Sequence, residues 1–200
     1  MQLTIPAATG ARWLINSSMN KAELRRSLLK TRQALEPEVW RAQSDRLCEN
    51  LRLCPQFVQA KTVLAYFSFR QEPDLTPLFS LAKTWGFPRC AGRALQWHKW
   101  SPNDDPPQPG AYGILDPAID SPVLTADRVD LMLVPCVACD SRRYRLGYGG
   151  GFYDRLLSSP EWARIPTIGV VFEFARLPSL TIDEWDQPLQ AICTERGLFA

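Results

Sequence analysis

The segment from residue 145 to residue 154 constrains this chain most strongly, because four of its ten residues are glycine. It follows an almost wholly apolar stretch, residues 129–137, that is predicted to form a buried strand, and it precedes a helix predicted from Tyr153 to Leu157. Glycine adopts positive φ freely and lets the main chain approach a ligand closely. A glycine loop between a strand and a helix therefore predicts a cradle of backbone N–H groups around an anion such as phosphate.

The loop does not match the common phosphate-binding signatures. No Gly-Lys-Ser/Thr ends it, which excludes a Walker A motif. Phe152 stands where the last glycine of a dinucleotide-binding fingerprint would lie, and no acidic residue follows at the required distance on a strand. A turn that happens to be rich in glycine is the alternative, but the two regular elements around the loop favour a built site.

Composition excludes several classes of function. The chain has 200 residues, 46% of them hydrophobic, and a net charge of +2, so one domain with a large core is expected. This charge gives no electrostatic case for binding nucleic acid or a membrane surface. The sequence has no run of 18 apolar residues, so no membrane-spanning helix is expected.

Residues 1–18 make a poor signal peptide, because they lack a basic start and a long apolar core. We expect them to form a disordered extension ahead of one domain at residues 19–200. The six cysteines are irregularly spaced, which favours a reduced, cytoplasmic protein with structural cysteines, including the pair Cys136 and Cys139. The single histidine, His98, cannot complete a zinc site of usual spacing.

Hydrophobic periodicity predicts alternating helices and strands. Helices are expected over residues 20–35, 37–53 and 75–85, and strands over residues 62–69, 87–91, 95–100, 129–137 and 167–172. Four prolines make residues 102–109 an irregular loop. This order predicts an α/β fold in three layers, with a mainly parallel sheet flanked by helices, and ligands of such sheets bind at the carboxyl ends of the strands.

A few charged residues outside the loop could share in a site. Lys21 and Arg25 are four residues apart, so they lie on one face of the first helix, where they suit a polyphosphate or are simply solvated. Glu72 has no capping role visible from its spacing and could accept hydrogen bonds from a polar heterocycle. Asp154 lies where a magnesium ligand beside bound phosphates belongs, whereas Asp186 alone could be a turn residue.

These motifs occur in the order found in the 5-formyltetrahydrofolate cyclo-ligase family, which the chain resembles from about residue 21 to residue 195. The most specific match is Pro135, then Asp140, then residues 145–154. Supporting matches are the segments at residues 21–25, 72–76, 112–117 and 185–188. The resemblance implies a three-layer α/β fold of the kind shared with sugar-phosphate isomerases and coenzyme A transferases.

The resemblance also implies an activity, the ATP-driven, magnesium-dependent conversion of 5-formyltetrahydrofolate to 5,10-methenyltetrahydrofolate with release of ADP and phosphate. It implies a monomer with a small-molecule folate substrate, polyglutamylated or not. Lys21 and Arg25 would hold the ATP phosphates, and Asp154 and Asp186 would hold magnesium. Glu72 and the stretch from Gly149 to Tyr153 would face the folate. The nucleotide would be wrapped by Arg145, Leu146, Gly147, Tyr148, Gly149, Gly150, Gly151, Phe152 and Tyr153.

This chemistry suits the residue types present. A formyl oxygen leaves poorly until ATP converts it to a phosphate ester, and phosphoryl transfer needs mainly positioning and charge neutralisation. The neighbouring folate nitrogen then attacks, so no nucleophilic side chain is required. Some relatives carry lysine at the position of Gly150 and tyrosine at that of Phe152, so the loop here depends more on Lys21, Arg25 and Arg145.

Two other readings of the sequence stay open at this point. A phosphosugar isomerase on the same kind of fold would use the glycine loop for a substrate phosphate and need neither ATP nor a metal. A non-catalytic module that binds a nucleotide or a folate would leave Lys21, Glu72, Asp154 and Asp186 as dispensable solvated residues.

Overall fold

The computed structural model describes residues 19–200, and the extension predicted at residues 1–18 lies outside the described part. The chain begins with α1 (Lys21–Gln33), whose start is fixed by a capping box between Asn20 and Glu23. Pro37 opens α2 (Pro37–Leu53), as predicted, because proline fits the first turn of a helix. Pro55 ends α2 but also begins the short helix α3 (Pro55–Gln59), which was not predicted.

The centre of the molecule is an eight-stranded sheet in the order β13-β12-β10-β7-β1-β2-β3-β6. Its five central strands pair in parallel: β12 (Ala191–Thr194), β10 (Thr167–Val170), β7 (Leu131–Pro135), β1 (Thr62–Leu64) and β2 (Thr84–Ala91). The edges are antiparallel: β13 (Gly197–Phe199) lies beside β12, while β3 (Ala94–Lys99) and β6 (Val123–Leu124) follow β2. The sheet is therefore parallel where it is buried on both faces and antiparallel where it meets solvent.

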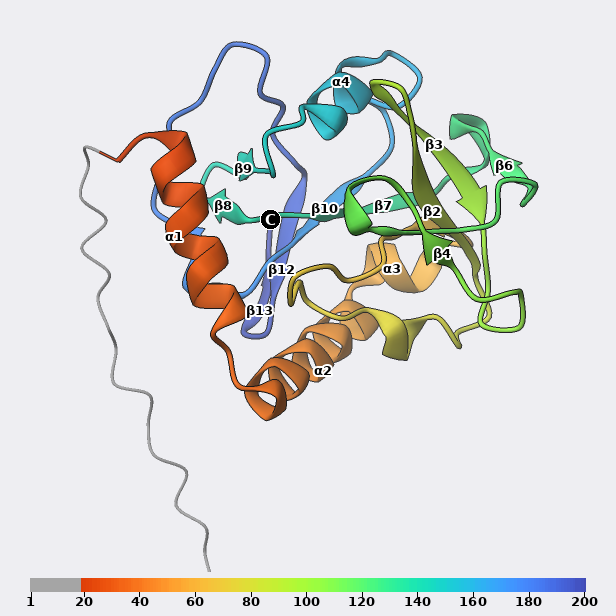
Figure 1. The fold of residues 1–200 in the computed structure, drawn as a ribbon, viewed down its shortest axis with the longest axis horizontal. Coiled ribbons are helices and arrows are strands. Elements are labelled where there is room, and N and C mark those ends of the chain that lie inside the picture. Colours follow the sequence, from red (N-terminus) through yellow and green to blue (C-terminus); the bar gives the residue numbers. More distant parts are fainter. Residues whose placement is uncertain (1–18) are drawn as a thin grey trace, which may run out of the picture.

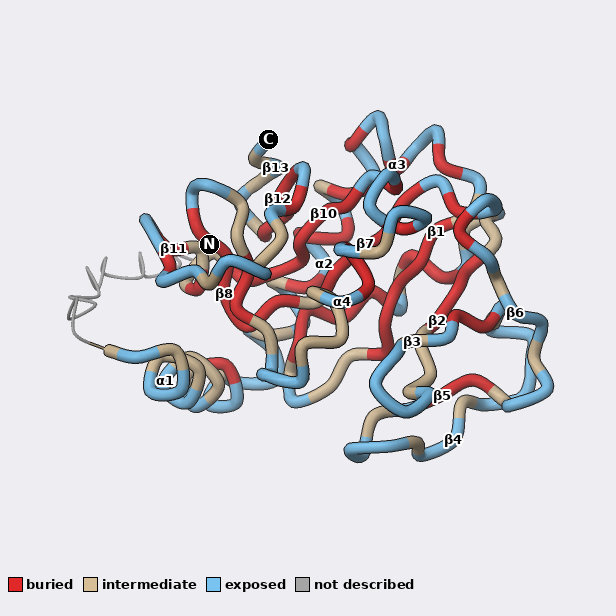
Figure 2. The backbone as a smooth tube through the Cα atoms, turned by 90° about the horizontal axis from the view of Figure 1, so that it is seen from above, coloured by how far each residue is buried: buried red, intermediate tan, exposed pale blue. Residues whose placement is uncertain are grey.

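Two hydrophobic clusters cover the two faces of this sheet. Val63 on β1 belongs to the cluster that contains α2 and α3, and its neighbour Leu64 belongs to the other, which contains α4 (Phe152–Ser158) and takes side chains from α1. Figure 1 shows α2 and α3 on one side of the strands and α4 on the other. The central strands are almost wholly buried, whereas α1 is largely exposed (Figure 2). Helices and strands thus form a mixed α/β fold around one large sheet.

The glycine loop follows a strand of a small second sheet and does not follow β7 directly. β8 (Ala138–Asp140) pairs with β9 (Arg145–Leu146) in an antiparallel hairpin, and β11 (Arg176–Leu177) lies parallel to β8 on its other side. The prediction that one strand over residues 129–137 leads into the loop was therefore incomplete. The hairpin moves the loop away from the end of β7 and towards α1.

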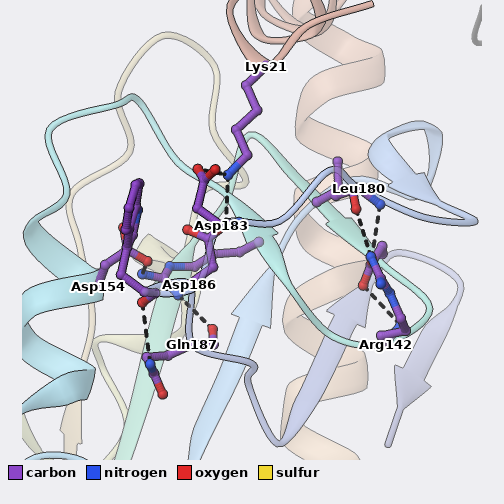
Figure 3. Close-up of polar contacts among 10 residues, drawn as sticks. Lys21, Arg142, Asp154, Leu180, Asp183, Asp186 and Gln187 are labelled. Atoms are coloured by element: carbon purple, nitrogen blue, oxygen red, sulfur yellow. Dashed lines mark hydrogen bonds and ion pairs between the residues drawn. The ribbon is translucent and has the colours of Figure 1, made fainter. Parts of the chain in front are cut away.

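Asp140 holds this hairpin together from a fully buried position. Its carboxylate accepts hydrogen bonds from the backbone N–H groups of Arg142, Tyr144 and Leu180, at 2.9 to 3.0 Å. The guanidinium of Arg142 adds an ion pair at 2.7 Å and also reaches the carbonyl of Leu180 (Figure 3). One carboxylate therefore ties the hairpin turn to the segment around residue 180.

Two predicted elements were wrong in extent or kind. The strand expected over residues 62–69 ends at Leu64, and the chain then turns towards Glu72. The helix expected over residues 75–85 is only a 3₁₀ turn at Thr76–Leu78, followed by β2 from Thr84. Thr84 and Trp85 pair with β1 in the sheet, so strand pairing overrides a weak local helical pattern.

The remaining described elements are short. The proline-rich segment is irregular, as predicted, apart from a two-stranded ribbon of β4 (Gln108–Pro109) and β5 (Leu115–Asp116). Further 3₁₀ turns lie at Ala111–Gly113, Ala126–Arg128 and Glu173–Ala175. Within residues 19–200, no helix combines the length and apolar character needed to cross a membrane.

The cysteine pair, Trp97 and His98 are parts of the core. Cys136 and Cys139 are buried with free thiols, which agrees with a structural role. A neighbouring thiol and burial raise the pKa of Cys139 well above its ordinary value, so it stays protonated. Trp97 and His98 are buried, while Trp100 is partly buried against the aromatic cluster around Phe87.

We predict that Asp140→Asn lowers the free energy of unfolding by on the order of 2–4 kcal/mol, since the new amide N–H₂ would face buried donors. Urea unfolding followed by circular dichroism measures this change. Asp127→Asn is the matched control, because Asp127 is exposed and contacts only the neighbouring exposed side chains of Thr125 and Arg128 among the described residues. Equal midpoints for both variants would contradict a central role for Asp140.

Candidate functional site

Helix α1 brings its first cation to two carboxylates at the other end of the sequence. The Lys21 ammonium lies 2.6 Å from an oxygen of Asp183 and 2.7 Å from one of Asp186 (Figure 3). Burial alone would raise the pKa of Asp186, but the hydrogen bond from Lys21 and the positive charge of Lys21 lower it. The backbone N–H of Asp183 also donates to Asp186, at 2.8 Å. Lys21 and Asp186, two predicted site residues 165 positions apart, are therefore in direct contact.

The second cation of α1 contacts the glycine loop itself. The Arg25 Nε donates to the carbonyl of Gly147 at 2.6 Å. Its guanidinium lies 3.6 Å from where a Cβ on Gly149 would be, so the helix and the loop are closely packed at this point. The structure thus brings Lys21 and Arg25 together with the loop, which the sequence spacing alone could not show.

Two of the loop glycines have conformations that other residues rarely adopt. Gly149 has φ +100° and Gly151, which precedes α4, has φ +66°. From Gly147 to Gly151, no backbone N–H has an acceptor within the described part of the chain. Several free N–H groups in succession, in a turn that contains positive φ angles, form a concave site for an anion.

Arg145 and Asp154 close the loop at its two ends. The Arg145 guanidinium, almost fully buried, donates to Asp154 at 2.6 Å and to the carbonyl of Gln187 at 3.0 Å. Its charge also contributes to lowering the pKa of Asp186. One oxygen of Asp154 and one of Asp186 have no hydrogen bond to any described residue. These two carboxylates therefore each keep an oxygen that could reach a cation.

The described residues offer no larger set of metal-ligating side chains than such a pair. Residues 19–200 contain no cluster of three or more histidine, cysteine, aspartate or glutamate side chains arranged for a metal ion. Magnesium commonly takes only one or two carboxylates and completes its shell with water and substrate phosphates. The donor set at Asp154 and Asp186 fits that pattern and does not fit a structural zinc site.

Glu72 lies in a buried turn between the end of β1 and the 3₁₀ turn at Thr76–Leu78. One carboxylate oxygen accepts the N–H of Phe69 at 3.1 Å, and the Glu72 carbonyl accepts Trp40 Nε1 at 2.9 Å. Burial raises the pKa of Glu72 to about 7, although Arg32, the Phe69 N–H and the Tyr148 hydroxyl oppose the shift. A carboxyl group in this environment changes its charge near neutral pH.

A cleft of about 450 Å³ opens beside the carboxyl end of the glycine loop. It is lined by Arg93, Gly151, Asp154, Arg155, Ser158, Ser159 and Trp185. Arg155 donates to the carbonyls of Gly150 and Arg93, both at 2.9 Å, and so fixes the loop against the β2–β3 hairpin. The cleft places Asp154 at its wall but does not include Glu72.

Sequence reasoning missed several residues of this region. Arg32 lies eleven residues after Lys21, and helical spacing could have placed it on the same face. Asp183 precedes Asp186 by three residues in a polar segment, with no further signal. Arg155 carried no pattern that points to a site, because its place depends on the packing of α4. Trp185 belongs to the motif at residues 185–188, but its place beside the glycine loop was not predicted.

Comparison with known proteins gives a consistent result. The model of the 5-formyltetrahydrofolate cyclo-ligase family matches residues 17–195. The chain is 31% identical over 172 residues to 5-formyltetrahydrofolate cyclo-ligase of Escherichia coli K12, covering 82% of this chain and 93% of that one. It is also similar to the NMR structure of Aquifex aeolicus 5,10-methenyltetrahydrofolate synthetase, with TM-score 0.79, 34% identity and coverage of 90% and 92% of the two chains.

A further solved structure supports the fold. The Mycoplasma pneumoniae 5,10-methenyltetrahydrofolate synthetase superposes with TM-score 0.71 at 20% identity, covering 88% of this chain and 99% of that one. None of these relatives is named as an isomerase or as a non-catalytic binding protein. With a family model that spans most of its length, the chain belongs to the 5-formyltetrahydrofolate cyclo-ligase family.

Proposed function

We propose that this enzyme carries out the ATP-driven, magnesium-dependent cyclisation of 5-formyltetrahydrofolate to 5,10-methenyltetrahydrofolate, with release of ADP and phosphate. Family membership supports the reaction class. The single observation that carries the proposal is the contact between α1 and the two halves of the site. Lys21 reaches Asp186, and Arg25 reaches the glycine loop at Gly147.

The triphosphate would lie along the glycine loop. The free N–H groups from Gly147 to Gly151 supply neutral donors, and Lys21, Arg25 and Arg145 supply positive charge at its edge. Phosphoryl transfer depends mainly on positioning and on charge neutralisation, which such a set provides. Arg145 and Leu146 enter the loop from β9, and Phe152 and Tyr153 leave it at the start of α4.

Asp154 and Asp186 are the side chains that would hold magnesium, since each keeps one carboxylate oxygen without a protein donor in the described part of the chain. Bound magnesium neutralises phosphate charge. Arg145 pairs with Asp154 and Lys21 pairs with Asp186, and these ion pairs keep both carboxylates near the loop. Both cations would be freed to contact phosphate oxygens as the nucleotide binds.

Glu72 and the stretch from Gly149 to Tyr153 would form the folate side of the site. Glu72 is a buried acceptor for the N–H groups of a polar heterocycle. Phe152 offers an aromatic ring close to Tyr112, with ring centroids 6.2 Å apart. Phe69 and Tyr148 form a second such pair, also at 6.2 Å. Aromatic rings that are partly exposed next to a buried acid suit a flat heterocyclic ligand.

The reaction needs no nucleophile from the protein. The formyl oxygen takes the terminal phosphoryl group of ATP, and ADP departs. The neighbouring N–H nitrogen of the folate attacks the activated carbon, forms the new C–N bond and releases its proton to solvent. The C–O bond then breaks and phosphate leaves with the oxygen. The chain's residues bind, orient and neutralise charge throughout, and this agrees with the absence of a nucleophile–base pair from the proposed site residues.

Three further points belong to this proposal. The kinship of the three-layer arrangement with sugar-phosphate isomerases and coenzyme A transferases is inferred from the resemblance of the sequence. The enzyme is proposed to be cytoplasmic, because its cysteines are free, and to be a monomer, as the resemblance of the sequence implies. Residues 1–18 are proposed to be dispensable for activity.

We predict that the purified protein, given ATP, magnesium and 5-formyltetrahydrofolate, develops the near-ultraviolet absorbance of the methenyl product. Omission of ATP or addition of a chelator should abolish the signal, because the formyl oxygen is then not activated. Absence of the signal with folded protein would refute the proposed activity. Turnover of a phosphosugar without ATP would favour the isomerase alternative.

We predict that Asp186→Asn raises the magnesium concentration needed for half-maximal activity by about tenfold or more, as expected when a charged ligand is lost. Titration of activity with magnesium measures the effect. Asp183→Asn is the matched control, because Asp183 also pairs with Lys21 but is not a predicted ligand. Equal magnesium curves for the two variants would argue against ligation by Asp186.

We predict that the KM for 5-formyltetrahydrofolate rises as the pH falls through about 7, because Glu72 becomes protonated and ceases to accept hydrogen bonds. Glu72→Gln should give a high KM that is independent of pH in this range. The raised pKa also means that the Glu72 contribution to stability falls as the pH rises from 4.5 to about 7. The variant should therefore be at least as stable as the wild type at mildly alkaline pH, as measured by thermal unfolding.

A further inference from the structure

Helix α1 carries a third cation on the face that meets the glycine loop. Arg25 lies four residues after Lys21, and Arg32 lies eleven residues after it. The three side chains therefore leave the helix within about 40° of one another. Lys21 and Arg25 have proposed roles with phosphate. Arg32 belongs to none of the motifs that point to function, yet it is the buried member of the three, with 3% of its surface exposed.

The Arg32 guanidinium is held by neutral oxygens. Its Nε donates to the carbonyl of Arg70 at 3.0 Å, and its Nη2 donates to the hydroxyl of Tyr148. The Phe69 carbonyl lies 3.5 Å from Nη2. Arg32 makes no salt bridge with a described residue, and its buried Nη1 has no hydrogen-bond partner among them. A buried cation without a paired anion is costly, so its retention calls for an explanation.

Arg32 donates a hydrogen bond to the same turn that contains Glu72. Arg70 and Gln71 both have positive φ, at 49° and 54°, which is uncommon for residues other than glycine. Arg32 fixes the Arg70 carbonyl from α1, and the Gln71 side chain donates to the Leu35 carbonyl at 3.1 Å. The strained turn therefore depends on contacts with the carboxyl end of α1.

Tyr148 connects this turn to the glycine loop. Its ring packs against Phe69 and lies 5.7 Å from the guanidinium carbon of Arg32. Its hydroxyl faces the Glu72 carboxyl, and this polar neighbour opposes the rise in the pKa of Glu72. Arg32 therefore donates hydrogen bonds both to the glycine loop, at Tyr148, and to the turn that contains Glu72, at Arg70.

We propose that Arg32 is a positioning residue of the cyclisation reaction, which fixes Tyr148 of the glycine loop and the Glu72 turn in one arrangement for the folate. This inference rests on the proposed function. Arg32 acts through these two neighbours and through its charge, while Lys21 and Arg25 serve the phosphates. Its loss should therefore affect the folate far more than the nucleotide.

The charges around Glu72 make the role of Arg32 measurable. The groups that face Glu72 are Arg32 from α1, Tyr66 after β1, Tyr148 from the loop and Tyr153 from α4. Burial raises the pKa of each of these tyrosines above its ordinary value, so all three stay neutral around pH 7. Arg32 is then the only charged group among them, and its removal should raise the pKa of Glu72 further.

Two substitutions separate the charge of Arg32 from its geometry. Arg32→Lys keeps the charge but lacks the planar guanidinium, whose Nε and Nη2 donate to the Arg70 carbonyl and the Tyr148 hydroxyl from two fixed positions. It should raise the KM for 5-formyltetrahydrofolate about tenfold, with the KM for ATP little changed. The pH below which this KM rises should stay near the wild-type value. Arg32→Met should raise the KM as much and also move that pH upwards. Arg26→Met is the control, because Arg26 lies exposed on another face of α1.

A double-mutant cycle tests whether Arg32 acts through Tyr148. Tyr148→Phe removes only the hydroxyl, and the double variant Arg32→Lys/Tyr148→Phe should bind 5-formyltetrahydrofolate no more weakly than the weaker single variant. Binding is measured by calorimetry without ATP, and folding is checked by circular dichroism. If the two substitutions weaken binding by factors that multiply, or if a folded Arg32→Lys variant has the wild-type KM, the positioning role is overturned but the proposed function is not. Failure of the wild type itself to bind 5-formyltetrahydrofolate would overturn the proposed function and this inference together.

Discussion

The contact of one face of α1 with the glycine loop is the interaction on which the site depends. Lys21, Arg25 and Arg32 leave the helix on that face and reach, in order, Asp186, the Gly147 carbonyl and Tyr148. Loop N–H groups alone form a neutral cradle, but a triphosphate carries several negative charges. Helix α1 adds fixed positive charge beside the loop, and in the proposed function this one rigid element would serve both the nucleotide and the folate side of the site.

The site contains features that are energetically unfavourable by themselves, as well as favourable contacts. Burial of Glu72 raises its pKa to about 7, and Arg32 is buried without a salt bridge to any described residue. Arg70 and Gln71 occupy a strained turn between them. Such features persist only where the surrounding structure fixes them, and here α1 with the segment after it and α2 do so. Their concentration around one turn supports its assignment to the folate side.

The fold could be predicted in outline because its main signals are local. Proline placed the start of α2, and the apolar runs at the centre of the sheet were found at their correct positions, as β7 and β10. Predictions were wrong where pairing decides the conformation. Thr84 and Trp85 follow a helical pattern but join β1, and the β8–β9 hairpin separates β7 from the glycine loop. Residues paired across the sheet leave no periodicity that a single segment can reveal.

The sequence by itself determined the chemistry that the loop can support. Glycine at positions 149 and 151 is required by positive φ, and the flanking motifs identified the family. Only the tertiary structure decided which charges serve the loop. Asp186 and Lys21 are 165 residues apart, and Arg32 meets Tyr148 across 116 residues. Helical spacing shows which side chains share a face, but long-range packing alone decides what that face touches.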